Sequence, residues 1–282
     1  MRADRRDLLS LLAALALVGV SASALLGGIG GGGGAAAAAP PDGHVAGCAI
    51  SFSGDNTVIV QPGLARDADD AATITVASAI TLTTADQAYD AATGGGLDTG
   101  AARVANTWYY AHLANSTTVG ILLSTSRTAP TLPGGVTRTR WIGTCRADAT
   151  ADWLTCLSHG DGARWMIYVR ENTRDAPLEV LSAGGATAFT AVSMSSVVPP
   201  EAWFVLLAIE PGTSFTSITS QGGLGVSHER IFNAGANANQ ANGGIRGIVV
   251  SVAQQQEFLY QVGGNTTDLQ VEGFQINCDG TE

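Results

Sequence analysis

Apolar and polar residues alternate in short segments along most of the chain. A period of two is typical of half-buried β-strands, and turns rich in Gly, Asn and Asp separate the segments. The pattern predicts an all-β fold, an antiparallel β-sandwich of jelly-roll type. The expected strands are Ala49–Ser53, Thr57–Val60, Thr73–Ala77, Ala79–Thr83, Trp108–Leu113, Val119–Ser124, Thr137–Thr144, Trp153–Ser158, Arg164–Arg170, Leu178–Leu181, Phe189–Met194, Trp203–Glu210, Ser214–Thr219, Arg230–Asn233, Ile245–Ala253, Glu257–Val262 and Asp268–Ile276, with a loop over Asp86–Thr99.

The N-terminal 42 residues have a different pattern. Leu8–Leu26 is a run of 19 uncharged residues, which predicts an apolar helix within residues 1–26. Residues 27–42 are almost entirely Gly, Ala and Pro and predict a linker. Residues 43–282 then form the β-rich head, with a possible internal seam at residues 183–185. The candidate anchoring side chains of the helix are Leu8, Leu9, Leu11, Leu12 and Leu15.

Three interpretations of the apolar segment stay open. Basic residues before it and small residues at its end are typical of a secretory signal, and Arg5–Arg6 is similar to a twin-arginine signal. Its 19 residues are also about the length that crosses a bilayer. The third interpretation is a helix buried in an assembly, because a helix that is apolar on every face must pack against something. An ordered anchor in an assembly is the favoured interpretation.

Composition and charge narrow the function classes. The chain of 282 residues has 13% charged residues, no lysine and a net charge of −10. Nucleic-acid binders carry basic patches, and none is visible here, so no nucleic-acid partner is expected. About 240 residues remain for the head, which is enough for one large all-β domain.

Four cysteines are distributed without any C-x-x-C spacing, so zinc and redox motifs are not indicated. Cys48 and Cys278 lie near the two ends of the head, where a disulfide would join terminal strands. Cys145 and Cys156 flank an expected hairpin turn near Asp148–Asp152, and so they could lie opposite each other. The alternative for both pairs is that they are buried free thiols that behave as small hydrophobic residues.

Motifs for catalysis are missing from the sequence. It contains no H-E-x-x-H, G-x-S-x-G or phosphate-binding loop, and neither an enzymatic activity nor a cofactor is expected. Ser158–Asp161 is a polar turn. Asp67, Asp69 and Asp70 could offer oxygen ligands to calcium, but a solvated acidic loop is the preferred interpretation and no metal site is assigned.

Aromatic and arginine side chains supply the candidate surface contacts. Strand alternation puts Tyr109 on the face opposite to Trp108, so Tyr109 is expected to face outward. Arg138 and Arg140 share one face of a strand, where they could hold a carboxylate or a neighbouring subunit. Trp108, Trp141 and Trp203 are expected in the core.

The segment Asn106–Gly143 carries a family resemblance. Its NTWYY, STSRTAPTLPGG and RWIG segments resemble the C-terminal module of tailed-phage virion proteins, such as tail fibres, head fibres and spikes. The similarity extends from about Gly43 to Cys278, with departures at Tyr110 (usually His) and Val136 (usually Tyr). The resemblance implies a structural subunit of a bacteriophage, homotrimeric, located in the virion and attached to other virion proteins by its N-terminus. It also implies a head that projects toward the host surface, with glycan as the expected contact.

A second hypothesis comes from another class of protein. An exported or membrane-anchored bacterial surface protein with a lectin-like β-sandwich would have the same order of N-terminal segment, linker and head. Loss of the first 24 or so residues would favour export. A polysaccharide-degrading enzyme is a third option, but it would need clustered carboxylates, and the acidic residues here are scattered.

Overall fold

The computed structural model describes residues 41–53, 56–83, 85–169, 178–211, 216–220, 229–232, 245–252, 256–264 and 266–278. The chain divides into two units, Met1–Ala39 and Pro40–Glu282, and every described residue belongs to the second. Leu8–Leu26, with its five candidate anchoring leucines, therefore lies outside the described residues. Within the described part, no helix is long and apolar enough to cross a membrane.

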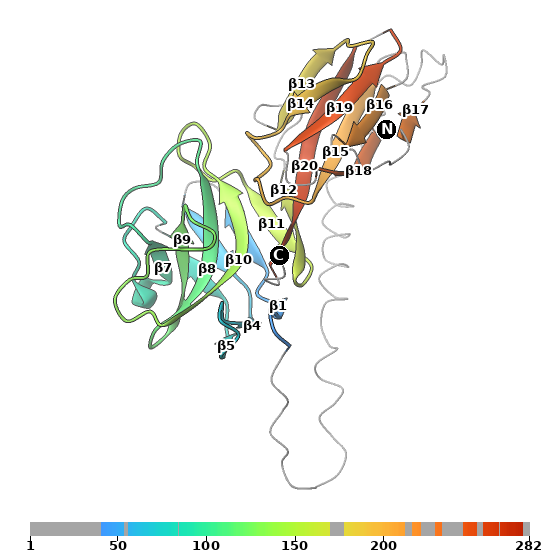
Figure 1. Ribbon diagram of the computed structural model, residues 1–282. Coiled ribbons are helices and arrows are strands. Elements are labelled where there is room, and N and C mark those ends of the chain that lie inside the picture. The colour runs from blue at the N-terminus through green and yellow to red at the C-terminus, as the bar shows by residue number, and fades with distance from the viewer. Residues whose placement is uncertain are drawn as a thin grey trace, which may run out of the picture. The chain divides into compact units, whose positions relative to one another are not determined.

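The described residues form an all-β structure with four sheets (Figure 1). A nine-stranded sheet, here called the large sheet, contains β18 (Ile245–Ser251), β15 (Phe204–Pro211), β20 (Thr267–Asn277), β12 (Ala163–Tyr168), β11 (Cys156–His159), β2 (Ile50–Ser53), β3 (Thr57–Val60) and β6 (Ile80–Leu82) in that order, with β13 (Glu179–Gly184) also paired to β20. A four-stranded sheet, the β8 sheet, has the order β10 (Arg138–Arg146), β8 (Trp108–Asn115), β9 (Val119–Ser124) and β7 (Gly95–Leu97).

Two smaller sheets complete the described strands. One has the order β1 (Val45–Gly47), β4 (Gly63–Arg66) and β5 (Thr73–Val76). The other has the order β14 (Thr190–Ser193), β19 (Glu257–Val262), β16 (Thr216–Ser220) and β17 (Glu229–Phe232). The described strand pairs are antiparallel except β7 with β9, which is parallel. A short 3₁₀ helix, η1 (Ala91–Thr93), precedes β7.

Burial alternates along many strands, as the period of two in the sequence predicts. In β12, Arg164, Met166 and Tyr168 are buried, while the intervening side chains are exposed or half-buried. β19 and β3 alternate in the same way. The inward side chains of the large sheet build the core, because burying apolar surface is the main favourable contribution to folding.

The core lies between the β8 sheet and the large sheet. Trp153 packs edge-on against Phe52 of β2, with ring centroids 5.2 Å apart, and against Tyr109 of β8 at 5.6 Å. Gly143 of β10 allows a close approach, since a Cβ atom there would lie 2.7 Å from Ile50 Cγ2. Side chains from both sheets thus interlock in one continuous hydrophobic cluster.

Several expectations about the elements are corrected. The sequence pattern missed β1, β4 and β7, and β7 lies inside the segment that was expected to be a loop. Trp203 was expected in the core, but it is 46% exposed because it precedes β15 on the solvent side. The possible seam at residues 183–185 coincides with the end of β13, which pairs with β20.

The turn between Cys145 and Cys156 is present as expected. Asp148 N donates to Asp152 O (2.8 Å), and Asp148 Oδ1 accepts from Thr150 N (2.7 Å). The two cysteines belong to different sheets, β10 and β11, yet their Sγ atoms are 3.4 Å apart. All four cysteines are buried free thiols.

Candidate functional site

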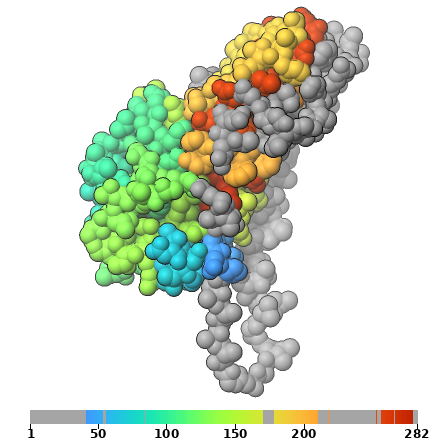
Figure 2. Space-filling model, viewed as in Figure 1, coloured from blue at the N-terminus to red at the C-terminus, as the bar shows by residue number. Residues whose placement is uncertain are grey.

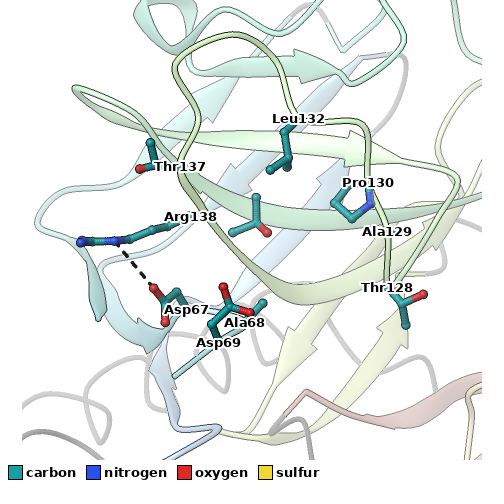
Figure 3. Close-up of a pocket in the computed structure, with 10 residues that line it drawn as sticks. Asp67, Ala68, Asp69, Thr128, Ala129, Pro130, Leu132, Thr137 and Arg138 are labelled. Atoms are coloured by element: carbon teal, nitrogen blue, oxygen red, sulfur yellow. Dashed lines mark ion pairs between the residues drawn. The ribbon is translucent and has the colours of Figure 1, made fainter. Parts of the chain in front are cut away.

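A shallow hollow of about 270 Å³ is the candidate binding site (Figure 3). Three segments enclose it: the β4–β5 turn, the long connection from β9 to β10, and the first residues of β10. Figure 2 shows the cyan residues of β4 and β5 beside the green residues of the β8 sheet. The hollow is lined by Asp67, Ala68, Asp69, Thr128, Ala129, Pro130, Leu132, Thr137, Arg138 and Thr139.

Asp67 organises the β4–β5 side of the hollow. Its Oδ1 accepts hydrogen bonds from the backbone N–H groups of Ala71 (2.7 Å) and Ala72 (3.1 Å). A carboxylate that accepts backbone N–H groups in this way fixes a tight turn. Ala68 N then donates to Thr139 O at 2.7 Å, which joins the turn to β10. The hollow is therefore built on a hydrogen-bonded frame.

Arg138 supplies the positive charge of the hollow. Its Nε lies 3.7 Å from Asp67 Oδ2, and its side chain is 46% exposed, so the guanidinium remains accessible (Figure 3). Of the predicted surface contacts, Arg138 is the one that the structure leaves at the surface. Leu132, which is 49% exposed, adds an apolar wall. A guanidinium, threonine hydroxyls and an apolar wall can hold a carboxylate or a hydroxyl-rich ligand.

Arg140 is buried, so the expectation that it contacts a partner at the surface is wrong. It is 5% exposed, and its Nη2 donates to Gly43 O (2.6 Å) and to Cys278 O (2.5 Å). Arg138 and Arg140 point to the same face of β10. Arg138 lies at the exposed beginning of the strand, whereas Arg140 is covered by the backbone at Gly43 and Cys278. The guanidinium of Arg140 thus fastens the beginning of the head to its end.

Tyr109 is also in the core rather than on the surface. It is 3% exposed, and its hydroxyl accepts a hydrogen bond from Val104 N at 2.7 Å. The alternation of side chains along the strand did not predict burial here, because β8 is covered on both faces and all six residues between its ends are buried. One face of β8 meets the large sheet, and the other meets side chains of the β9–β10 connection and of the loop before β15.

A polar cluster that the sequence did not indicate covers this second face of β8. The Tyr110 hydroxyl donates to Glu201 Oε1 at 2.5 Å, and Arg127 Nε is 4.0 Å from the same oxygen. The Arg127 guanidinium also lies over the Trp141 ring, 5.3 Å from its centroid. Burial, and then the neighbouring Glu201, raise the pKa of Tyr110 well above its usual range, so the phenol stays protonated.

His112 extends the cluster toward the core. It is 2% exposed and its Nε2 lies 3.3 Å from Ser126 O, so the neutral ring donates there. Burial lowers the pKa of His112 from 6.5 to about 4, although the bond to Ser126 and the charge of Asp98 act in the opposite direction. The neutral imidazole is therefore the form that the folded head accommodates.

We expect His112 to make stability depend on pH. Its folded-state pKa lies below the unfolded-state value, so its contribution is complete above pH 6.5 and is lost as the pH falls toward 4. Urea unfolding between pH 7 and 4 should show a loss of about 3 kcal/mol. His112→Gln should flatten this slope, and His159→Gln, at an exposed site, should leave it unchanged. An unchanged slope in His112→Gln would contradict the assignment.

Two other candidates are used for local structure. Ser158 Oγ accepts from Ile50 N (2.7 Å), and Asp161 Oδ1 accepts from Gly47 N (2.8 Å), so this polar turn holds β1 and β2 in place. In the acidic loop, Asp70 Oδ1 accepts from Gly43 N at 2.7 Å. The described residues contain no group of three or more His, Cys, Asp or Glu side chains placed to hold a metal ion.

Comparisons with known proteins identify no relative. No family model matches the chain, and neither the curated proteins nor the solved structures contain a match.

Proposed function

We propose that the chain is a structural subunit of a tailed-bacteriophage particle. Residues 43–282 form a jelly-roll-like β-sandwich head, the apolar N-terminal segment docks onto other virion proteins, and several copies of the head associate, most simply as a homotrimer. The resemblance over Gly43–Cys278 and the all-β, antiparallel architecture support this proposal. The observation that carries it is an uncharged, partly apolar face on the large sheet.

This outer face is the side of the large sheet that points away from the core. Its register follows from the paired strands β11, β12, β20 and β15. Leu157 on β11 is 41% exposed and Phe204 on β15 is 37% exposed, and the apolar side chains of Ile167, Trp165 and Leu206 on the same face are half-buried. The two rows consist of Leu157, Ile167, Gly273 and Leu206, and of His159, Trp165, Gln275 and Phe204.

Charge favours a second copy of this chain as the occupant. No residue in the two rows is acidic or arginine, whereas the whole chain has a net charge of −10. Two copies with that charge repel each other, and they can approach most closely through a face that has no charge. Solvated sheet faces usually carry polar outward residues, so an uncharged face with exposed Leu and Phe is suited to burial between copies.

Cross-linking tests this association. All four native cysteines are buried, so Leu157→Cys or Phe204→Cys adds an accessible thiol to the outer face. We expect a bismaleimide to convert these full-length variants mainly into covalent dimers at micromolar concentration, because each chain then has one accessible thiol. Val104→Cys is the matched control, because Val104 is 60% exposed but lies outside the two rows. Equal cross-linking of all three variants, or none at the outer face, would reject the interface.

The hollow around Arg138 favours a second candidate function. An exported or membrane-anchored bacterial surface protein with a lectin-like head could bind a hydroxyl-rich glycan there, since Arg138, the two aspartates and the threonines of the hollow offer hydrogen-bond donors and acceptors. The same hollow would serve host attachment in a phage subunit. N-terminal sequencing of the protein from its native source separates the two: loss of about the first 24 residues favours export, and their retention in purified particles favours the virion subunit.

A further inference from the structure

We propose that Cys145 and Cys156 are a redox-active pair that closes to a disulfide between the β8 sheet and the large sheet. Cys145 lies in β10 and Cys156 begins β11, and their Sγ atoms are 3.4 Å apart. Each cysteine is 1% exposed. This inference does not depend on the proposed function, because it concerns two side chains in the core of the head.

The backbone between the two cysteines holds them close together. Ala147 and Trp153 form an isolated antiparallel bridge, and Leu154 N donates to Arg146 O at 3.0 Å. The turn at residues 148–152 is closed by Asp148, whose carboxylate accepts from Thr150 N and Asp152 N. A disulfide has an S–S length of about 2.05 Å, so the sulfurs must approach by little more than an ångström, which small side-chain rotations supply.

The two sulfurs are in direct contact, so exchange with a disulfide oxidant can join them. Cys156 Sγ donates to Cys145 Sγ, and Cys145 Sγ lies 3.0 Å from Leu154 O. One thiol loses its proton and attacks the oxidant, which releases one small thiolate and leaves a mixed disulfide. The second cysteine, also deprotonated, then displaces the other small thiol. Two protein thiols thus become one disulfide while the oxidant, oxidised glutathione for example, is reduced to two thiols.

The same burial makes the reaction slow in the closed head. Burial, and then the adjacent Cys156, raise the pKa of Cys145 well above its usual range, so little thiolate is present. Exchange therefore requires local opening of the turn at residues 148–152. Once formed, the bond would link the two sheets beside Trp153, close to the centre of the aromatic cluster. Oxidation should increase the resistance of the head to unfolding.

Peptide mapping of the full chain tests the proposal. The protein is incubated with oxidised glutathione or with a phosphine reductant, alkylated in denaturant and digested. We expect one cross-linked peptide pair containing Cys145 and Cys156 after oxidation, and four alkylated cysteines after reduction. The apparent melting temperature of the oxidised form should be roughly 5–10 °C higher. Alkylation of Cys145 and Cys156 in the oxidised sample, stable glutathione adducts on them, or their linkage to other cysteines would overturn the proposal.

Matched variants assign the thermal shift to this pair. The Cys145→Ala/Cys156→Ala variant should melt at one temperature in both redox conditions. Cys48→Ala, which removes another buried thiol, should keep the redox-dependent shift. A shift that persists in the double variant would show that another pair is responsible. The mapping of the unmodified chain stands on its own if a variant fails to fold.

Discussion

Replacement of Arg164 by Met is expected to destabilise the head by about 3 kcal/mol. Arg164 is fully buried, and its guanidinium donates from Nη1 to Cys48 O (2.7 Å) and from Nη2 to Gly47 O (2.5 Å). Met fills a similar volume but cannot donate, so the backbone carbonyls of Gly47 and Cys48 lose their charged partner. Chemical denaturation monitored by tryptophan fluorescence measures the loss.

The matched control for Arg164 is Arg146→Met. Arg146 is half-buried on β10, and its Nη2 contacts Asn106 Oδ1 at 3.4 Å, so its loss should cost less than about 1 kcal/mol. Arg164→Lys should fall between the two, because an ammonium lacks the planar fork that reaches two carbonyls at once. If Arg164→Met were as stable as Arg146→Met, the buried guanidinium would not be fastening residues 47–48 to β12.

Trp153→Ala is expected to cost about 4 kcal/mol. The indole of Trp153 is 3% exposed and lies between the rings of Phe52 and Tyr109. The guanidinium of Arg103 stacks on it at 4.4 Å and is itself held by Asp86, with Nε to Oδ1 at 2.6 Å. Removal of the indole leaves a cavity between the two sheets and also deprives a buried cation of its aromatic partner.

Trp203→Ala is the control for Trp153, since it removes the same side chain from a site that is 46% exposed. Its cost in the free energy of unfolding should stay below about 1 kcal/mol. Thermal and urea unfolding of the two variants side by side check the prediction. Equal losses for Trp153 and Trp203 would mean that the aromatic core is not where the structure places it.

The alternating pattern was a good guide to strands that have one buried face. β3 and β12 have both an alternating sequence and alternating burial. β1, β4 and β7 were missed because they are three or four residues long and contain glycine. Such short segments show no alternation of apolar and polar residues. Their pairing is fixed instead by contacts from distant parts of the chain, such as Arg164 on Gly47.

The candidate site was harder to predict for the same reason. The sequence pointed to Arg138, but it could not pair that residue with Asp67, because the two residues are far apart in the chain and meet only after the sheets have packed.

 Tyr109 and Arg140 were placed at the surface by strand parity, and both are buried because β8 and β10 are covered on two sides. The cluster of Tyr110, Glu201 and Arg127 likewise unites distant segments that share no local signal.

The mass of the full chain in solution tests the central proposal most directly. Sedimentation equilibrium should give a mass near three times the 28.6 kDa of one chain, and Leu157→Glu, which places a charge on the outer face, should shift the protein toward the single-chain mass. That comparison separates association through the head from association through the apolar N-terminal segment. A single species of 28.6 kDa at every concentration, which also fails to sediment with phage particles, would contradict the proposal.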